Sequence, residues 1–100
     1  MVKHAGWLWR RKLWLAQEAI EHLERMNGEI DVDSIDARIR AIRGVAQVAH
    51  EEAGDKDAAT VIGISDTALD VLGSGDLGGV RQCLEQIRDA ERRCTQRTLH

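Results

Sequence analysis

Three tryptophans and three basic residues are crowded into residues 7–15, which read Trp-Leu-Trp-Arg-Arg-Lys-Leu-Trp-Leu. Tryptophan and arginine are strongly enriched among the residues that dominate binding energy at protein interfaces. On a helix, Trp7 and Trp14 share a face while Trp9 lies well round from them, so the three indoles do not all fit into one core. We therefore predict a partner-binding surface that contacts another protein or a second copy of this chain, formed by Trp7, Trp9, Arg10, Arg11 and Trp14. Burial of the indoles at the end of the domain and contact with a nucleic acid or a membrane surface are the alternatives.

The middle of the chain carries the opposite charge. Residues 51–76 hold seven acidic residues and one lysine, a local net charge of −6, whereas the first fifteen residues carry +4. Acidic residues at helix N-termini explain part of this charge, because that end of a helix favours negative groups. The alternative function is an inhibitor that competes with nucleic acid for a basic groove of a partner. Its acidic docking face is predicted at Glu51, Glu52, Asp55, Asp57, Asp66 and Asp70.

Two pairs of carboxylates, each spaced three residues apart, are candidates for metal chemistry. They occur in Glu18-Ala19-Ile20-Glu21 and in Glu52-Ala53-Gly54-Asp55. The pairs resemble the ExxE and ExxD motifs of the all-α nucleotide pyrophosphohydrolases, the MazG-like group. The resemblance covers these short motifs alone. It implies a Mg²⁺-dependent nucleotide hydrolase in which Glu18, Glu21, Glu52 and Asp55 hold the metal, because Mg²⁺ prefers oxygen ligands.

The other groups capable of chemistry do not form a recognisable set. The four histidines lack the spacing of metal ligands. Nothing close to Cys83 or Cys94 indicates a nucleophile paired with a base. Residues 73–78 match GxGxxG, but they follow a helical pattern and are better interpreted as a turn between helices. From the residues alone we predict no catalytic residue, no metal and no cofactor, and we favour a non-enzymatic binding or regulatory protein over an enzyme.

Composition limits the classes of protein that the chain can belong to. Its 100 residues, 43% hydrophobic and 31% charged, suffice for a single folded domain over residues 1–100. The net charge of −3 disfavours nucleic-acid binding, which needs a basic surface. No apolar run approaches the ~18 residues of a transmembrane helix. Two cysteines interpreted as free thiols are typical of the cytoplasm, where we expect the protein to act.

Hydrophobic periodicity predicts four helices, over residues 5–26, 34–53, 57–72 and 76–98. The chain has no proline to interrupt them, and its core must be built from leucine, isoleucine, valine and alanine because phenylalanine and tyrosine are absent. Asp33 or Ser34 is expected to cap the second helix, whose arginines are placed mostly on its outer side. The β-branched run over residues 60–64 leaves a strand as the alternative there. Short joints between the helices predict an all-α, antiparallel four-helix bundle with up-and-down connections.

Overall fold

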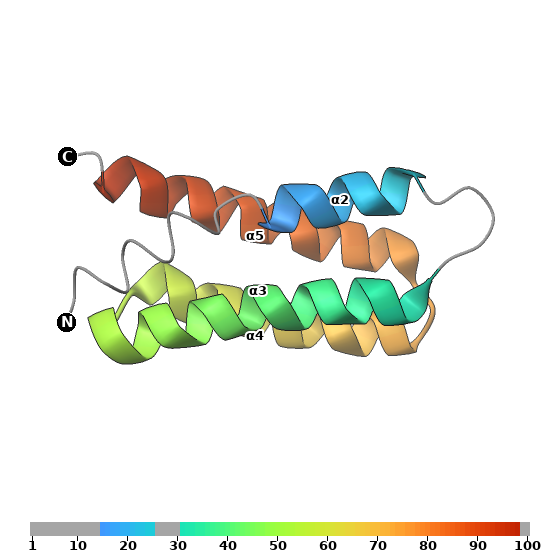
Figure 1. Cartoon of the computed structure of the whole chain (residues 1–100), viewed down its shortest axis with the longest axis horizontal. Helices are drawn as coiled ribbons and strands as arrows, with labels where there is room; N and C mark the ends of the chain where they lie inside the picture. The colour runs from blue at the N-terminus through green and yellow to red at the C-terminus, as the bar shows by residue number, and fades with distance from the viewer. Residues whose placement is uncertain (1–14, 26–30, 99–100) are drawn as a thin grey trace.

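Four helices form the part of the chain that the computed structural model describes, which is residues 15–25 and 31–98 without the side chains of Ala53 and residues 94–98. The helices are α2 (Leu15–Arg25), α3 (Val32–Ala53), α4 (Lys56–Gly73) and α5 (Leu77–Thr98) (Figure 1). The predicted all-α four-helix bundle is confirmed. Residues 60–64, for which a strand was the alternative, lie within α4, so the strand interpretation is wrong.

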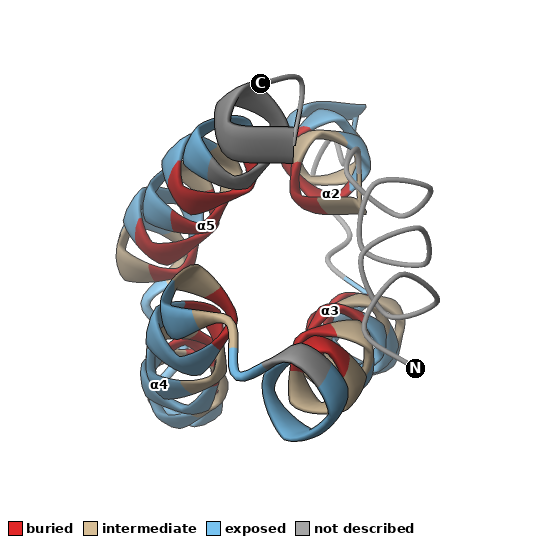
Figure 2. Cartoon of the chain, turned by 90° about the vertical axis from the view of Figure 1, so that its left-hand side faces the viewer, coloured by how far each residue is buried: buried red, intermediate tan, exposed pale blue. Residues whose placement is uncertain are grey.

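Side-chain contacts between helices show that neighbouring helices run in opposite directions. On one side, Arg81 of α5 binds Glu24 at 2.8 Å, and Arg88 binds Gln17 at 2.9 Å. Residue numbers rise along α5 as they fall along α2, so the two helices are antiparallel. Seen along the bundle axis, the four helices surround one core in the cyclic order α2, α3, α4, α5 (Figure 2).

Among the described residues the core is mainly aliphatic, with Cys83 also part of it and with Ser65 and Glu91 as its buried polar residues. Each helix contributes one stripe of apolar side chains, as the periodicity predicted. The largest fully buried hydrophobic side chains are Ile20, Ile35, Ile39, Ile42, Val61, Val80, Leu84 and Ile87. Burying a side chain of this size contributes about 1.5–3 kcal/mol relative to leaving it in water. Alanines fill the positions between them, and they allow the helices to pack closely.

Capping residues fix where the helices begin. Asp31 caps α3, because its side chain accepts a hydrogen bond of 3.1 Å from the backbone N–H of Ser34. The prediction that Asp33 or Ser34 caps this helix is therefore wrong, since α3 begins two residues earlier. Asp55 caps α4 by accepting hydrogen bonds from the backbone N–H groups of Asp57 and Ala58. Asp76 accepts from the N–H of Gly79 at the start of α5.

The described part of α2 is shorter than α3. α2 has 11 residues and α3 has 22. The predicted first helix over residues 5–26 is observed over Leu15–Arg25, and residues 1–14 and 26–30 lie outside the described residues. Within the described residues, no helix combines the length and the apolarity needed to cross a membrane.

Candidate protein-binding surface

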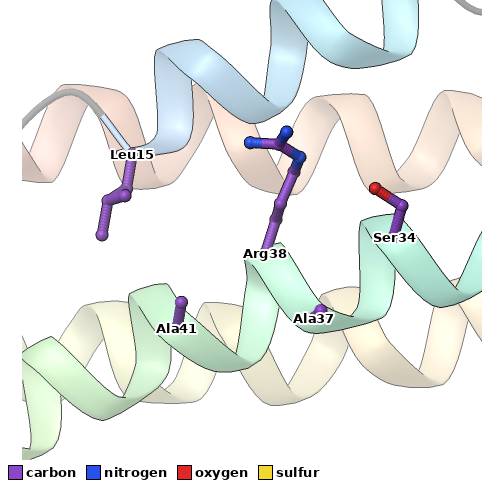
Figure 3. A pocket seen from close by; sticks show the side chains of 5 residues that line it. All are labelled: Leu15, Ser34, Ala37, Arg38 and Ala41. Carbon is purple, nitrogen blue, oxygen red and sulfur yellow. The ribbon is translucent and has the colours of Figure 1, made fainter.

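A groove runs between α2 and α3 where α2 begins. It has a volume of about 320 Å³ and is lined by Leu15, Ser34, Ala37, Arg38 and Ala41 (Figure 3). We call it the α2–α3 groove. Ala37 and Ala41 are exposed and have short side chains; Ala41 lies between Leu15 and Arg38, and Ala37 lies between Arg38 and Ser34 (Figure 3). The volume is at the small end of ligand pockets, about 300–1,000 Å³, so the groove suits one large side chain.

Arg38 is the charged group of the α2–α3 groove. Its side chain rises from α3 toward the side of the bundle formed by α2 (Figure 3). The residue is half-buried, and its Nε atom is fully buried with no hydrogen-bond partner among the described residues. Leaving a buried donor unsatisfied costs about 1–3 kcal/mol, and more for a charged group. A ligand in the groove can reach only the part of the half-buried Arg38 side chain that remains exposed, because the Nε atom is covered.

A hydrogen bond between His22 and Ser34 closes one end of the groove. The Nε2 atom of His22 lies 3.0 Å from the Oγ atom of Ser34, and both side chains are half-buried. This contact holds α2 against α3 at the end where both helices meet the 26–30 segment. The other end of the groove, at Leu15 and Ala41, lies where the described part of α2 begins.

The predicted partner-binding residues Trp7, Trp9, Arg10, Arg11 and Trp14 all lie outside the described residues. Their covalent connection to the groove is nevertheless given by the sequence, because Trp14 directly precedes Leu15 and Leu15 lines the α2–α3 groove. Sequence reasoning did not identify the groove itself, because it placed the arginines of α3 on the outer side. The spacing of Ser34, Arg38 and Ala41 was the available signal, since residues three and four apart share a helix face.

The six residues of the predicted acidic docking face are divided between the end of α3, the N-cap of α4 and different sides of α4. Asp66 lies on the α3 side and binds Arg43 at 2.7 Å. Asp57 lies on the α5 side, where its carboxylate is 3.6 Å from Arg93. Asp55 is occupied as the cap of α4. Glu51, Glu52 and Asp70 are exposed, the first two at the end of α3 and the third near the opposite end of α4.

The four carboxylates of the nucleotide-hydrolase resemblance are not brought together. The His22–Ser34 contact sets the register between α2 and α3, and it places Glu18 level with Arg38. Glu52 is fourteen residues further along α3, or ~21 Å at the helical rise of 1.5 Å per residue. No group of three or more histidine, cysteine, aspartate or glutamate side chains within the described residues could hold a metal ion.

Glu91 is a buried carboxyl group that the sequence analysis missed. Its side chain is 2% exposed on α5, and the backbone of Ala16, in the first turn of α2, hydrogen-bonds to it. Burial raises the pKa of Glu91 from 4.5 to about 8, although the hydrogen bond from Ala16 acts in the opposite direction. Its place on the apolar stripe of α5, one residue after Ala90, was the signal in the sequence.

The chain matches no family model, and searches of curated proteins and of solved structures likewise found no significant match.

Proposed function

We propose that this chain is a non-enzymatic protein-binding module that acts in the cytoplasm and regulates a partner by occupying part of its surface. The partner is another protein or a second copy of this chain. The observation that carries the proposal is the α2–α3 groove, which is lined by the half-buried side chain of Arg38, a residue whose Nε atom has no partner among the described residues. A groove of this kind accepts an apolar side chain at Ala37 and Ala41 and a carboxylate or carbonyl oxygen at Arg38.

The tryptophan–arginine segment, residues 7–14, supplies the rest of the proposed surface. It joins the groove directly, because Trp14 is bonded to Leu15. Large aromatic side chains and arginines beside a small groove form the combination in which binding energy concentrates at protein interfaces. The proposed binding residues are thus Arg38 together with Trp7, Trp9, Arg10, Arg11 and Trp14.

Association of the full chain tests this proposal in two steps. Light scattering on a sizing column, at low and at moderate protein concentration, measures the solution mass and detects self-association. Immobilised full chain then retains binding proteins from a lysate of the source cells. We expect Trp14→Ala and the double variant Arg10→Ala with Arg11→Ala to lose the association that the wild-type chain shows.

Arg92→Ala is the matched control, because Arg92 is an exposed arginine on α5 away from the α2–α3 groove. It should associate like the wild-type chain. A chain that is monomeric at every concentration, and whose retained proteins are the same for the wild type and for Trp14→Ala, contradicts the proposal.

A further inference from the structure

The contact between Ser34 and His22 joins a hydroxyl group to a base. The Nε2 atom of His22 on α2 lies 3.0 Å from the Oγ atom of Ser34 on α3. A serine hydroxyl becomes a nucleophile when an imidazole within hydrogen-bond reach can take its proton. The two residues are twelve positions apart and lie on different helices, so the packing of α2 on α3 brings them together.

Neighbouring residues on each helix hold this pair in place. Asp31 accepts a hydrogen bond of 3.1 Å from the backbone N–H of Ser34, which fixes the chain in the first turn of α3. Glu18 precedes His22 by four residues, so the two side chains lie on the same face of α2. An acceptor on that face favours the imidazole form that carries its proton on Nδ1. In this form Nε2 accepts the hydroxyl proton of Ser34.

The α2–α3 groove gives a substrate access to this pair. Ser34 lines the groove, and its hydroxyl group points toward the α2 side (Figure 3). The volume of about 320 Å³ leaves room for a short acyl chain against Ala37 and Ala41. Arg38 lines the same groove one helical turn further along α3, or ~6 Å at the rise of 1.5 Å per residue. A positive charge there stabilises the oxyanion that forms when a hydroxyl group attacks a carbonyl carbon.

We propose that Ser34 is an acylation site that takes a short acyl group from an activated ester, with His22 as the base and Arg38 as the charge beside the oxyanion. The Oγ atom of Ser34 bonds to the carbonyl carbon of the ester while its proton passes to Nε2 of His22. The bond from that carbon to the leaving oxygen then breaks, and the leaving group takes the proton from His22. The acyl group remains on Ser34.

This inference goes beyond the proposed binding function and needs no partner protein. The chain takes up one acyl group and is a reactant, so the step is compatible with a non-enzymatic module. An acyl group on Ser34 would occupy the α2–α3 groove and would therefore compete with a partner that binds there.

Reaction of the full chain with p-nitrophenyl butyrate tests the proposal. Release of p-nitrophenolate measures the rate, and mass spectrometry of proteolytic fragments locates the butyryl group. We expect the folded wild-type chain to be butyrylated at Ser34 much faster than at Ser74. Ser74 is the internal reference, because it is an exposed serine whose hydroxyl donates to the backbone carbonyl of Asp70 at 3.3 Å.

Three variants separate the roles of the groups. Ser34→Ala should lose the butyryl group from this peptide. His22→Asn should slow the reaction of Ser34 by at least ~100-fold, as is typical when a general base is removed. His50→Asn, which removes an exposed histidine from α3, is its matched control and should react like the wild type. Arg38→Met should slow the reaction by at least ~10-fold, because it removes the charge beside the oxyanion.

Guanidinium-unfolded wild-type chain keeps the test valid if circular dichroism shows that His22→Asn does not fold. Unfolding separates Ser34 from His22, so Ser34 and Ser74 should then react at similar rates. Folded chain without a butyryl group on Ser34 would overturn the proposal. So would equal rates at Ser34 in folded His22→Asn and in the wild type, or the same ratio of Ser34 to Ser74 labelling before and after unfolding. An unchanged rate in Arg38→Met would contradict the place given to the oxyanion. All these readouts come from the isolated chain, so they are separate from the association measurements that test the proposed function.

Discussion

Two arginines on α3, Arg43 and Arg38, occupy opposite flanks of the same helix and have different surroundings. Arg43 faces α4 and binds Asp66 with an Nε–Oδ1 distance of 2.7 Å. Arg38 faces the α2 side, and its buried Nε atom has no partner among the described residues. Among the described residues, the α4-facing flank therefore pairs its arginine, whereas the α2-facing flank leaves the Nε atom of Arg38 without a partner. The comparison separates a charge that joins two helices from the charge to which we assign a binding role in the proposed function.

The largest effect should come from the apolar stripe that lies between these two flanks. Ile39→Ala removes a side chain that is 0% exposed, and we expect it to lower the free energy of unfolding by about 2–5 kcal/mol, because a cavity is added to the lost burial. Ala37→Ser, in the α2–α3 groove, should change it by less than about 0.5 kcal/mol, as is usual at exposed positions. Denaturant unfolding followed by circular dichroism measures both. Similar losses for the two variants would contradict the division between core and groove.

Glu91 allows a second test of how α2 is held in the bundle. It lies on α5, and the backbone of Ala16 in α2 hydrogen-bonds to it. A carboxyl group whose pKa is raised from 4.5 to about 8 in the folded chain stabilises the fold fully at acidic pH. That stability is lost as the pH rises from the unfolded pKa through the folded pKa. Glu91→Gln cannot ionise, so it should match the wild type only at about pH 4 and below, where the carboxyl group is protonated in both states. Above pH 8 it should be more stable by on the order of 2–4 kcal/mol.

Thermal unfolding measured across this pH range checks the effect of Glu91→Gln. Asp89→Asn is the control, because it removes a carboxylate from an exposed position two residues away on the same helix. Asp89→Asn should still lose stability between acidic and alkaline pH, as the wild-type chain does. Parallel pH profiles for the wild type and Glu91→Gln would show that the buried carboxyl group is not the cause.

A smaller loss of stability is expected at the N-terminus of α4, where the capping residue forms its hydrogen bonds within the chain. Asp55→Ala removes the cap that accepts hydrogen bonds from two backbone N–H groups. We expect a loss of about 1 kcal/mol in the free energy of unfolding, as is typical for an N-cap. Asp70→Ala, which removes an exposed carboxylate near the other end of α4, is the matched control and should have little effect. Denaturant titration distinguishes the two, and an equal response would contradict the capping role.

The smallest effects on stability should come from the two arginines themselves. Arg43→Met breaks an ion pair whose side chains are 38% and 55% exposed, so it should cost no more than about 1 kcal/mol. Arg38→Met removes an unsatisfied buried donor while keeping an unbranched side chain, so it should leave stability unchanged or raise it slightly. Melting temperatures of the two variants measure the difference. A greater loss for Arg38→Met than for Arg43→Met would show that Arg38 is a structural residue.

Over the described residues, the amino-acid sequence was sufficient to predict the helices and the bundle, because the apolar stripes follow the helical period. The ion pair between Asp36 and Arg40, with an Nε–Oδ1 distance of 2.6 Å, follows from their spacing of four residues. Spacing is a weaker guide at helix ends, where the choice among Asp31, Asp33 and Ser34 depends on the path by which the chain enters α3.

The candidate site was less predictable, because it depends on how the helices meet. Arg38 and Arg43 look alike in the sequence, and the bundle alone places one beside Asp66 and the other in the α2–α3 groove. Likewise, the acidic residues are close in sequence, but α4 places Asp57 and Asp66 on opposite sides. The burial of Glu91 required the position of Ala16, a residue 75 positions away in the chain.

Retention of binding proteins by immobilised Arg38→Met and Arg43→Met chains tests the central claim most directly. Both variants remove one positive charge from α3, and each is compared with the wild type in the same lysate and by light scattering in solution. We predict that Arg38→Met loses the association of the wild-type chain while Arg43→Met keeps it. Equal association by both variants, with both chains folded, would contradict a binding role for the α2–α3 groove.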